Sequence, residues 1–143
     1  MPRLLNIKYV MTRHPVTVNS QMQIEKAVKL MRKSGVSSLT IEENKIIKGI
    51  LTEGDIIEKA LLKNLDIKKN NVEKIMQRKV ITIHESADIM KAMSTMAEHD
   101  LRRLPVVDDN NSLIGLVTIK DMLQVQPELL NIVIEKGKLG LRR

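Results

Sequence analysis

The chain has 143 residues, of which 43% are hydrophobic and 29% are charged, the balance of a soluble globular protein. It has no cysteine, which excludes disulfides and thiolate chemistry. With no apolar run near the roughly 20 residues that cross a bilayer and no signal-peptide pattern in residues 1–11, a cytoplasmic protein without a membrane partner is expected. The net charge of +7 is compatible with an anionic partner, while a single aromatic residue, Tyr9, argues against a surface that stacks nucleic-acid bases.

The sequence contains two copies of one repeated unit. Residues 10–13 (Val-Met-Thr-Arg) align with residues 75–78 (Ile-Met-Gln-Arg), and after one inserted residue the segment 49–55 aligns with 115–121. Because self-similarity over most of a chain indicates a repeated supersecondary unit, the two halves are expected to share one fold.

Each copy begins with a short strand and a helix. Residues 16–18 and 81–83 are rich in Val, Ile and Thr, which favours strands. Ser20 and Ser86 are predicted to cap the helices that follow. Apolar residues at i, i+3, i+4 and i+7 predict one buried face on each helix: Ile24, Ala27, Val28 and Met31 in the first copy, and Ile89, Ala92, Met93 and Met96 in the second.

Each copy continues with two strands, separated by a turn rich in Glu, Asp and Asn, and with a second helix that begins near Thr52 or Thr118. The predicted strands and turns are 38–41, 42–44 and 49–51 in the first copy, and 104–107, 108–111 and 113–117 in the second. The element order is therefore β-α-β-β-α, twice.

A mixed α and β fold follows, written α/β or α+β. About 55 core-forming residues per copy are marginal for an independent domain, so the two repeats are expected to pack face to face about a pseudo-twofold axis and to leave two related clefts. The predicted organisation is repeat 1 at 6–63, a polar linker at 64–71, repeat 2 at 72–126, and a C-terminal helix with a basic tail at 127–143.

The motif Gly-h-h-Thr-x-x-Asp, where h is apolar, ends the core of each copy, at 49–55 and at 115–121. Thr followed three residues later by an acid is close to a capping box, and this structural role would explain both motifs. The same residues at the junction of a strand and a helix could bind a phosphate or a sugar diol. The motif alone leaves both interpretations open.

Taken together, the apolar-Met start, the Val-Thr-Val strand, the Leu-Pro-Val-Val-Asp strand and the motif, in this order and twice, resemble a pair of cystathionine-beta-synthase (CBS) domains over residues 6–130. The resemblance implies an adenosyl ligand, with the ribose hydroxyls bound by Asp55 and Asp121 and the phosphate or sugar contacted by Thr52 and Thr118. It also implies a homodimer. The early strands of the family line the base pocket, which points to Val16, Thr17, Val18, Ile81, Thr82 and Ile83.

The copies differ beside the third strand, where the second has Arg102-Arg103 and the first has Ser37-Ser38. The resemblance implies that basic residues here reach ligand phosphates, which Arg binds bidentately; the alternative is a pair of solvated residues at a strand edge. We predict two unequal clefts, with tighter binding of phosphorylated ligands where Arg102 or Arg103 reaches. The sequence does not decide which Asp that cleft contains.

The remaining polar residues of the sequence indicate neither a catalytic site nor a metal site. The three histidines lack metal-ligand spacing and are expected at the surface or in turns, and no Ser-His-Asp arrangement is evident. The acidic segment 108–111 is expected to be a hairpin turn because it lacks the Gly and later Glu of an EF-hand.

The predicted function is that of a stand-alone, non-catalytic regulatory module. It binds AMP, ADP, ATP or S-adenosylmethionine in the cleft between the repeats, requires no cofactor, and signals by conformational change to a partner protein. The alternatives are a nucleic-acid-binding protein that uses its basic surface and tail, and an interaction scaffold without a ligand.

Overall fold

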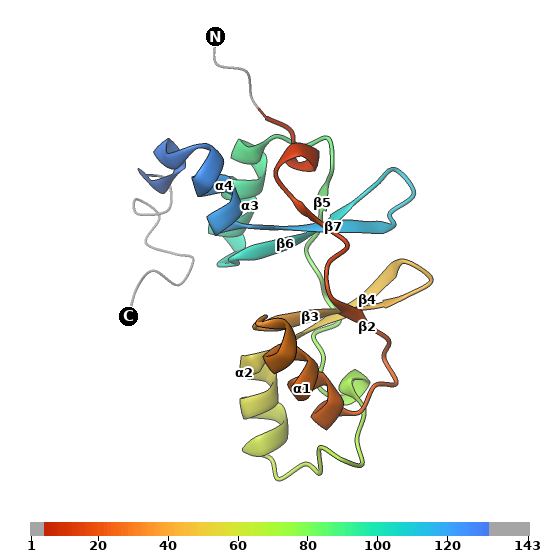
Figure 1. Cartoon of the computed structure of the whole chain (residues 1–143). Coiled ribbons are helices and arrows are strands. Elements are labelled where there is room, and N and C mark those ends of the chain that lie inside the picture. Colours follow the sequence, from red (N-terminus) through yellow and green to blue (C-terminus); the bar gives the residue numbers. More distant parts are fainter. Residues whose placement is uncertain (1–4, 132–143) are drawn as a thin grey trace. The chain divides into compact units, whose positions relative to one another are not determined.

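The computed structural model describes residues 5–131, which form two compact units (Figure 1). The Asp55 unit comprises residues 16–80. The Asp121 unit comprises, within the described chain, residues 5–15 and 81–131. Each unit therefore contains the helices of one repeat together with the leading segment of the other, since residues 5–15 start the first repeat and residues 72–80 start the second.

The Asp55 unit has a three-stranded sheet in the order β2-β3-β4, with β2 (Thr17–Val18) parallel to β3 (Ser38–Glu43) and β3 antiparallel to β4 (Ile46–Thr52). Asn44 and Lys45 connect β3 to β4, and both have positive φ values, 52° and 66°. Positive φ at both central residues is the geometry of a type I′ turn, which suits the twist of a two-residue hairpin.

Two helical segments pack with this sheet. Helix α1 (Ile24–Ser34) buries Ile24, Ala27 and Met31 on the predicted face and ends at Gly35, whose φ of 67° places it in the left-handed region. The second segment starts as α2 (Glu53–Asp55) and continues as a π-helical turn, η2 (Ile56–Leu61).

The Asp121 unit has a four-stranded sheet in the order β1-β7-β6-β5. Strand β5 (Ile83–His84) is parallel to β6 (Arg103–Val107), and β7 (Leu113–Thr118) is antiparallel to both β6 and β1 (Thr12–Arg13). The same unit contains two helices, α3 (Ile89–His99) and α4 (Ile119–Val125). It also contains two 3-10 turns, η1 (Ile7–Tyr9) and η4 (Pro127–Leu129). A third 3-10 turn, η3 (Val72–Lys74), belongs to the Asp55 unit. The two repeats of strands and helices confirm the predicted mixed fold.

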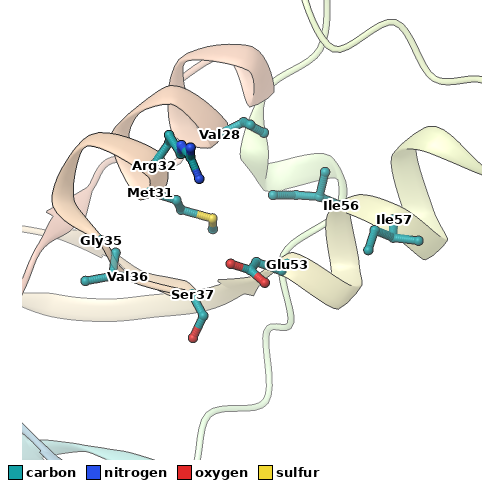
Figure 2. Close-up of a pocket in the computed structure, with 9 residues that line it drawn as sticks. All are labelled: Val28, Met31, Arg32, Gly35, Val36, Ser37, Glu53, Ile56 and Ile57. Carbon is teal, nitrogen blue, oxygen red and sulfur yellow. The ribbon is translucent and has the colours of Figure 1, made fainter.

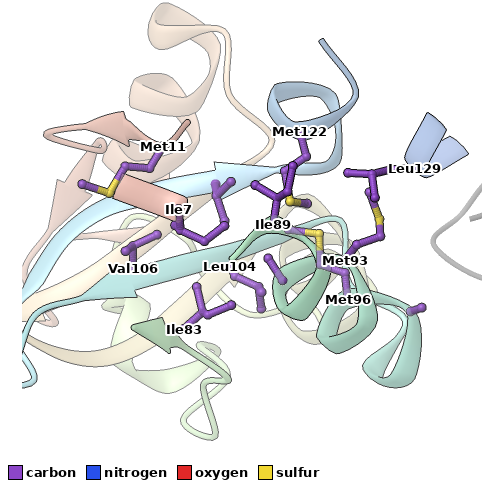
Figure 3. Close-up of a cluster of buried hydrophobic side chains, with 13 residues drawn as sticks. Ile7, Met11, Ile83, Ile89, Met93, Met96, Leu104, Val106, Met122 and Leu129 are labelled. Carbon is purple, nitrogen blue, oxygen red and sulfur yellow. The ribbon is translucent and has the colours of Figure 1, made fainter. Parts of the chain in front are cut away.

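The core of the Asp121 unit is made of Ile, Leu, Val, Ala and Met side chains (Figure 3). Helix α3 contributes Met93 and Met96, which are fully buried, and the leading segment contributes Ile7 and Met11. Flexible Met side chains fill irregular space well, which fits a chain without Phe or Trp. Leu129 closes this cluster with 2% of its surface exposed, and the rest of the predicted C-terminal helix, from Ile132 on, lies outside the described residues.

The predicted N-caps Ser20 and Ser86 are wrong. Helix α1 has Gln23 at its N-cap position without a side-chain hydrogen bond, and the hydroxyl of Ser20 instead donates to Glu43. Helix α3 is capped by Asp88, whose Oδ1 accepts a hydrogen bond from the backbone N–H of Lys91 at 2.8 Å. Both helices therefore start later in the chain than N-caps at Ser20 and Ser86 would place them.

The glycine of each repeated motif allows a close approach of backbone. A Cβ built on Gly49 would lie 2.8 Å from the carbonyl oxygen of Gln77, and one on Gly115 would lie 3.0 Å from that of Thr12. In both places the Met of the other repeat's leading segment, Met76 or Met11, packs over the glycine. In both units, therefore, the Met that starts one repeat packs against the Gly of the motif in the other repeat.

Candidate ligand-binding site

In each unit, part of the predicted site lies where one strand begins opposite the end of the next, β3 and β4 in the Asp55 unit and β6 and β7 in the Asp121 unit. In the Asp55 unit, Ser38 pairs with Thr52, so β3 begins opposite the end of β4, and Thr17 at the start of β2 pairs with Thr40, two residues further along β3. In the Asp121 unit, Arg103 at the start of β6 likewise pairs with Thr118 at the end of β7, whereas Ile83 pairs with Val106, three residues further along β6. Asp55 and Asp121 follow three residues after the paired threonines.

Both motifs form the predicted capping box. The Oγ of Thr52 accepts from the N–H of Asp55 at 3.1 Å, and the N–H of Thr52 donates to Oδ2 of Asp55 at 2.9 Å. The corresponding distances between Thr118 and Asp121 are 3.1 and 3.0 Å. The backbone N–H of the threonine binds one carboxylate oxygen, Oδ2, of each aspartate, so the second oxygen, Oδ1, lies outside the cap.

The two aspartates differ at this second oxygen. Asp55 is 5% exposed. Its Oδ1 accepts from Lys59 Nζ at 3.0 Å and from Gln77 Nε2 at 3.2 Å, and its Oδ2 also accepts from the hydroxyl of Thr52 at 3.0 Å. Asp121 is partly exposed, and within residues 5–131 its Oδ1 accepts no hydrogen bond.

The two arginines predicted to bind a ligand phosphate differ from each other in exposure. Arg102 is exposed, and its carbonyl oxygen accepts from the N–H of Ile119 at the start of α4. Arg103 is partly buried in β6, opposite Thr118. Ser37 is held in the equivalent way, because its carbonyl oxygen accepts from Glu53 N. The structure thus groups Arg102, Arg103, Thr118 and Asp121 in one unit.

The residues predicted to line a base pocket fall into two groups. Val18 and Ile83 are buried in the two hydrophobic cores. Val16 and Ile81 lie at the edges of these cores, and Thr17 and Thr82 are also partly exposed. The hydroxyl of Thr17 donates to Glu42 at 3.1 Å.

A cavity of about 510 Å³ in the Asp55 unit was not anticipated from the sequence (Figure 2). It lies between the C-terminal half of α1 and the segment α2–η2. Thr52 and Asp55 do not line it. The lining residues are Val28, Met31, Arg32, Gly35, Val36, Ser37, Glu53, Ile56 and Ile57. Ile57, which is 51% exposed, adds an apolar side chain to this lining.

His84 is hydrogen-bonded on both sides, to Ser86 Oγ and to Asp109 Oδ1, each at 2.7 Å. No motif in the sequence predicted a contact among these three residues. Nδ1 of His84 also accepts from the backbone N–H of Ser86 at 3.1 Å, and the side chain of Asp109 is 93% exposed. The chain of bonds ties β5 to the acidic turn, where Asp108 caps the N–H groups of Asn110 and Ser112 as expected for a hairpin turn.

The described residues contain neither a metal-binding cluster nor a membrane-spanning helix. No cluster of three or more His, Cys, Asp or Glu side chains is arranged to hold a metal ion in residues 5–131. Over the same part of the chain, none of the helices has the length and hydropathy required to span a membrane.

Known proteins are similar to this chain in sequence or in fold. The chain is 38% identical over 110 residues to the uncharacterized protein MK0525 of Methanopyrus kandleri, covering 76% of this chain and 56% of that protein. It is 34% identical over 117 residues to L-aspartate semialdehyde sulfurtransferase of Methanocaldococcus jannaschii, covering 81% of this chain but only 22% of that enzyme. The chain thus spans about half of the first relative and about a fifth of the second.

Among solved structures, the CBS domain pair of protein MJ0100, in complex with 5′-methylthioadenosine and S-adenosyl-L-methionine, has a TM-score of 0.76 and 31% identity. The match covers 88% of this chain and 98% of that one. The family model of the CBS domain matches twice, at residues 7–61 and 72–128. With two matched copies, each built around its own capped Thr-x-x-Asp motif, the chain belongs to the CBS domain family.

Proposed function

We propose that this chain is a non-catalytic regulatory module that binds an adenosyl ligand and passes the signal to a partner protein by a change in conformation. The candidate ligands are AMP, ADP, ATP and S-adenosylmethionine. The related pair of MJ0100 was solved with two adenosyl compounds, which supports this class of ligand. The observation that carries the proposal is the available carboxylate oxygen of Asp121.

A ribose diol offers two hydroxyl donors, and an ionised carboxylate accepts hydrogen bonds at both oxygens. Oδ1 of Asp121 is available for this purpose, while Oδ2 stays engaged in the cap. A hydrogen bond to a charged group contributes about 1.5–3 kcal/mol. Recognition of the diol by Asp121 is therefore expected to supply about one to two orders of magnitude in affinity.

Arg103 is the first residue of the neighbouring strand β6, and Arg102 directly precedes it. The guanidinium fork matches phosphate and carboxylate oxygens equally well. The same arginines therefore suit the phosphates of AMP or ATP and the amino-acid carboxylate of S-adenosylmethionine. 5′-Methylthioadenosine has neither group, so it separates the contribution of the arginines from that of the adenosine part.

The test is isothermal calorimetry with AMP, ATP, S-adenosylmethionine and 5′-methylthioadenosine, on the wild type and on Asp121→Asn. The substitution keeps an oxygen for the cap but replaces the other acceptor with an NH₂ donor. We expect a loss of 10- to 100-fold in affinity. Asp88→Asn is the matched control, because Asp88 also caps a helix of the same unit but is not a proposed ligand residue; it should bind as the wild type does.

A second comparison tests the role of the diol directly. Wild-type protein is expected to bind AMP more tightly than 2′-deoxy-AMP, and Asp121→Asn should lose most of this difference. If none of the four adenosyl compounds binds at concentrations up to the millimolar range, the proposed function is wrong.

A further inference from the structure

We infer that each chain binds one adenosyl ligand, in the Asp121 unit, because Lys59 and Gln77 already occupy in the Asp55 unit the carboxylate that a ribose would need. This inference rests on the proposed function and assigns its site. It also identifies the two side chains that close the other copy of the motif.

The closure is visible in the partners of Asp55. Lys59 Nζ lies 3.0 Å from Oδ1, and Gln77 Nε2 lies 3.2 Å from Oδ1 and 3.1 Å from Oδ2. The N–H and the hydroxyl of Thr52 donate to Oδ2. Four donor atoms thus surround a carboxylate that is 5% exposed, and a ribose diol could reach it only after Lys59 and Gln77 had moved away.

The hydroxyl of the motif threonine shows the same asymmetry. Thr52 Oγ accepts from Asp55 N and donates its proton to Asp55 Oδ2 at 3.0 Å. Thr118 Oγ accepts from Asp121 N in the same way, but within the described chain its proton has no acceptor. In the Asp121 unit, therefore, both a hydroxyl donor and a carboxylate acceptor remain for a ligand.

The alignment of the repeats shows which residues make this difference. An offset of 66 places Val125 at the position of Lys59, and an offset of 65 places Thr12 at the position of Gln77. The structure supports the second equivalence, since Gln77 forms a bridge with Ile50 while Thr12 pairs with Leu116, the counterpart of Ile50. Neither Val125 nor Thr12 has a side chain that can hold Asp121 as Lys59 and Gln77 hold Asp55.

The residues at the start of the neighbouring strands also favour ligand binding in the Asp121 unit. The Asp121 unit has Arg102 and Arg103 at the start of β6, and the Asp55 unit has Ser37 and Ser38 at the start of β3. A serine hydroxyl donates a single hydrogen bond, whereas a guanidinium carries five N–H donors. The unit with the occupied carboxylate is thus also the unit without cationic groups at this position.

The test is the number of sites per chain, measured by calorimetry and by equilibrium dialysis with radiolabelled AMP and S-adenosylmethionine. We expect one site in the wild type. Asp121→Asn should weaken this site at least 10-fold, whereas Asp55→Asn should leave its affinity within 2-fold. The double variant Lys59→Val/Gln77→Thr copies the other unit and should gain a second, weaker site.

The outcomes are distinguishable. Two sites of equal affinity in the wild type, or one site that survives Asp121→Asn but not Asp55→Asn, would overturn the inference and leave the proposed function intact. A double variant that keeps the wild-type circular dichroism spectrum and still binds one ligand would refute the closing role of Lys59 and Gln77. If no compound binds to the wild type, the proposed function and this inference fail together.

Discussion

Replacing Gly49 with alanine should weaken the contact between β4 and the leading segment of the second repeat. The added Cβ would lie 2.8 Å from the carbonyl oxygen of Gln77 and 2.8 Å from the sulfur of Met76, and ordinary contact begins at 3.4 Å. The two backbones must therefore separate by about 0.6 Å. This movement would stretch the reciprocal backbone hydrogen bonds between Ile50 and Gln77, which measure 2.9 and 2.8 Å.

Forcing an extra methyl group into a packed site costs about 1–3 kcal/mol. A loss of about 2 kcal/mol in the free energy of unfolding corresponds to a fall of about 4–8 °C in melting temperature for a chain of this size. The measurement is urea-induced unfolding followed by circular dichroism at 222 nm, combined with a thermal melt.

Gly54→Ala is the matched control. The nearest atom to a Cβ on Gly54 is the Oγ of Thr52 at 3.7 Å, an ordinary contact, and alanine in a helix is more stable than glycine by about 0.5–1 kcal/mol. Gly54→Ala should leave the melting temperature unchanged or raise it. If Gly49→Ala is as stable as Gly54→Ala, then the glycine does not serve the close approach of the two backbones, and the explanation of the motif is wrong.

Three further substitutions test other parts of the structure. Leu129→Ala should cost about 2–5 kcal/mol, the range for large core residues cut to alanine, because Leu129 is 2% exposed in the core of the Asp121 unit; a change below 1 kcal/mol in urea unfolding would contradict this packing. Gly35→Ala should cost about 1 kcal/mol, because its φ of 67° is unfavourable for a residue with a Cβ, and a thermal melt equal to that of the wild type would refute the assigned cap. Thr118→Val should cost about 1 kcal/mol through loss of the cap and should also weaken AMP binding in calorimetry, whereas unchanged binding would remove Thr118 from the site.

The repeated pattern was sufficient to predict the fold class and most elements. The helix faces that include Ile24 and Ile89 were predicted correctly because helical spacing of apolar residues is a local signal. The capping boxes that start at Thr52 and Thr118 were predicted because they depend on residues three apart in the chain. The N-cap of α1 was not predicted, since the engagement of Ser20 depends on a residue on a distant strand.

The assignment of the leading segments could not be obtained from the repeats. Sequence similarity shows that residues 10–13 and 75–78 have equivalent roles, but it does not show which half each segment completes. That choice depends on long-range packing, such as Met11 over Gly115. The closure of the Asp55 site is a similar case: comparing Lys59 with Val125 gives a signal, but only the structure brings Lys59 to Asp55.

The leading segment of each repeat packs in the unit that contains the helices of the other repeat, so each half of the chain contributes core residues to the other. If the chain were cut between residues 63 and 72, the N-terminal fragment would carry Ile7 and Met11, which belong to the core of the Asp121 unit. The C-terminal fragment would carry Val72, Ile75 and Met76, which belong to the core of the Asp55 unit. The first fragment lacks part of the core of its unit, and the second lacks strand β1 as well as part of its core. Neither is therefore expected to fold alone, and mixing them should restore both. The folding of each half of the chain is therefore expected to depend on the presence of the other half.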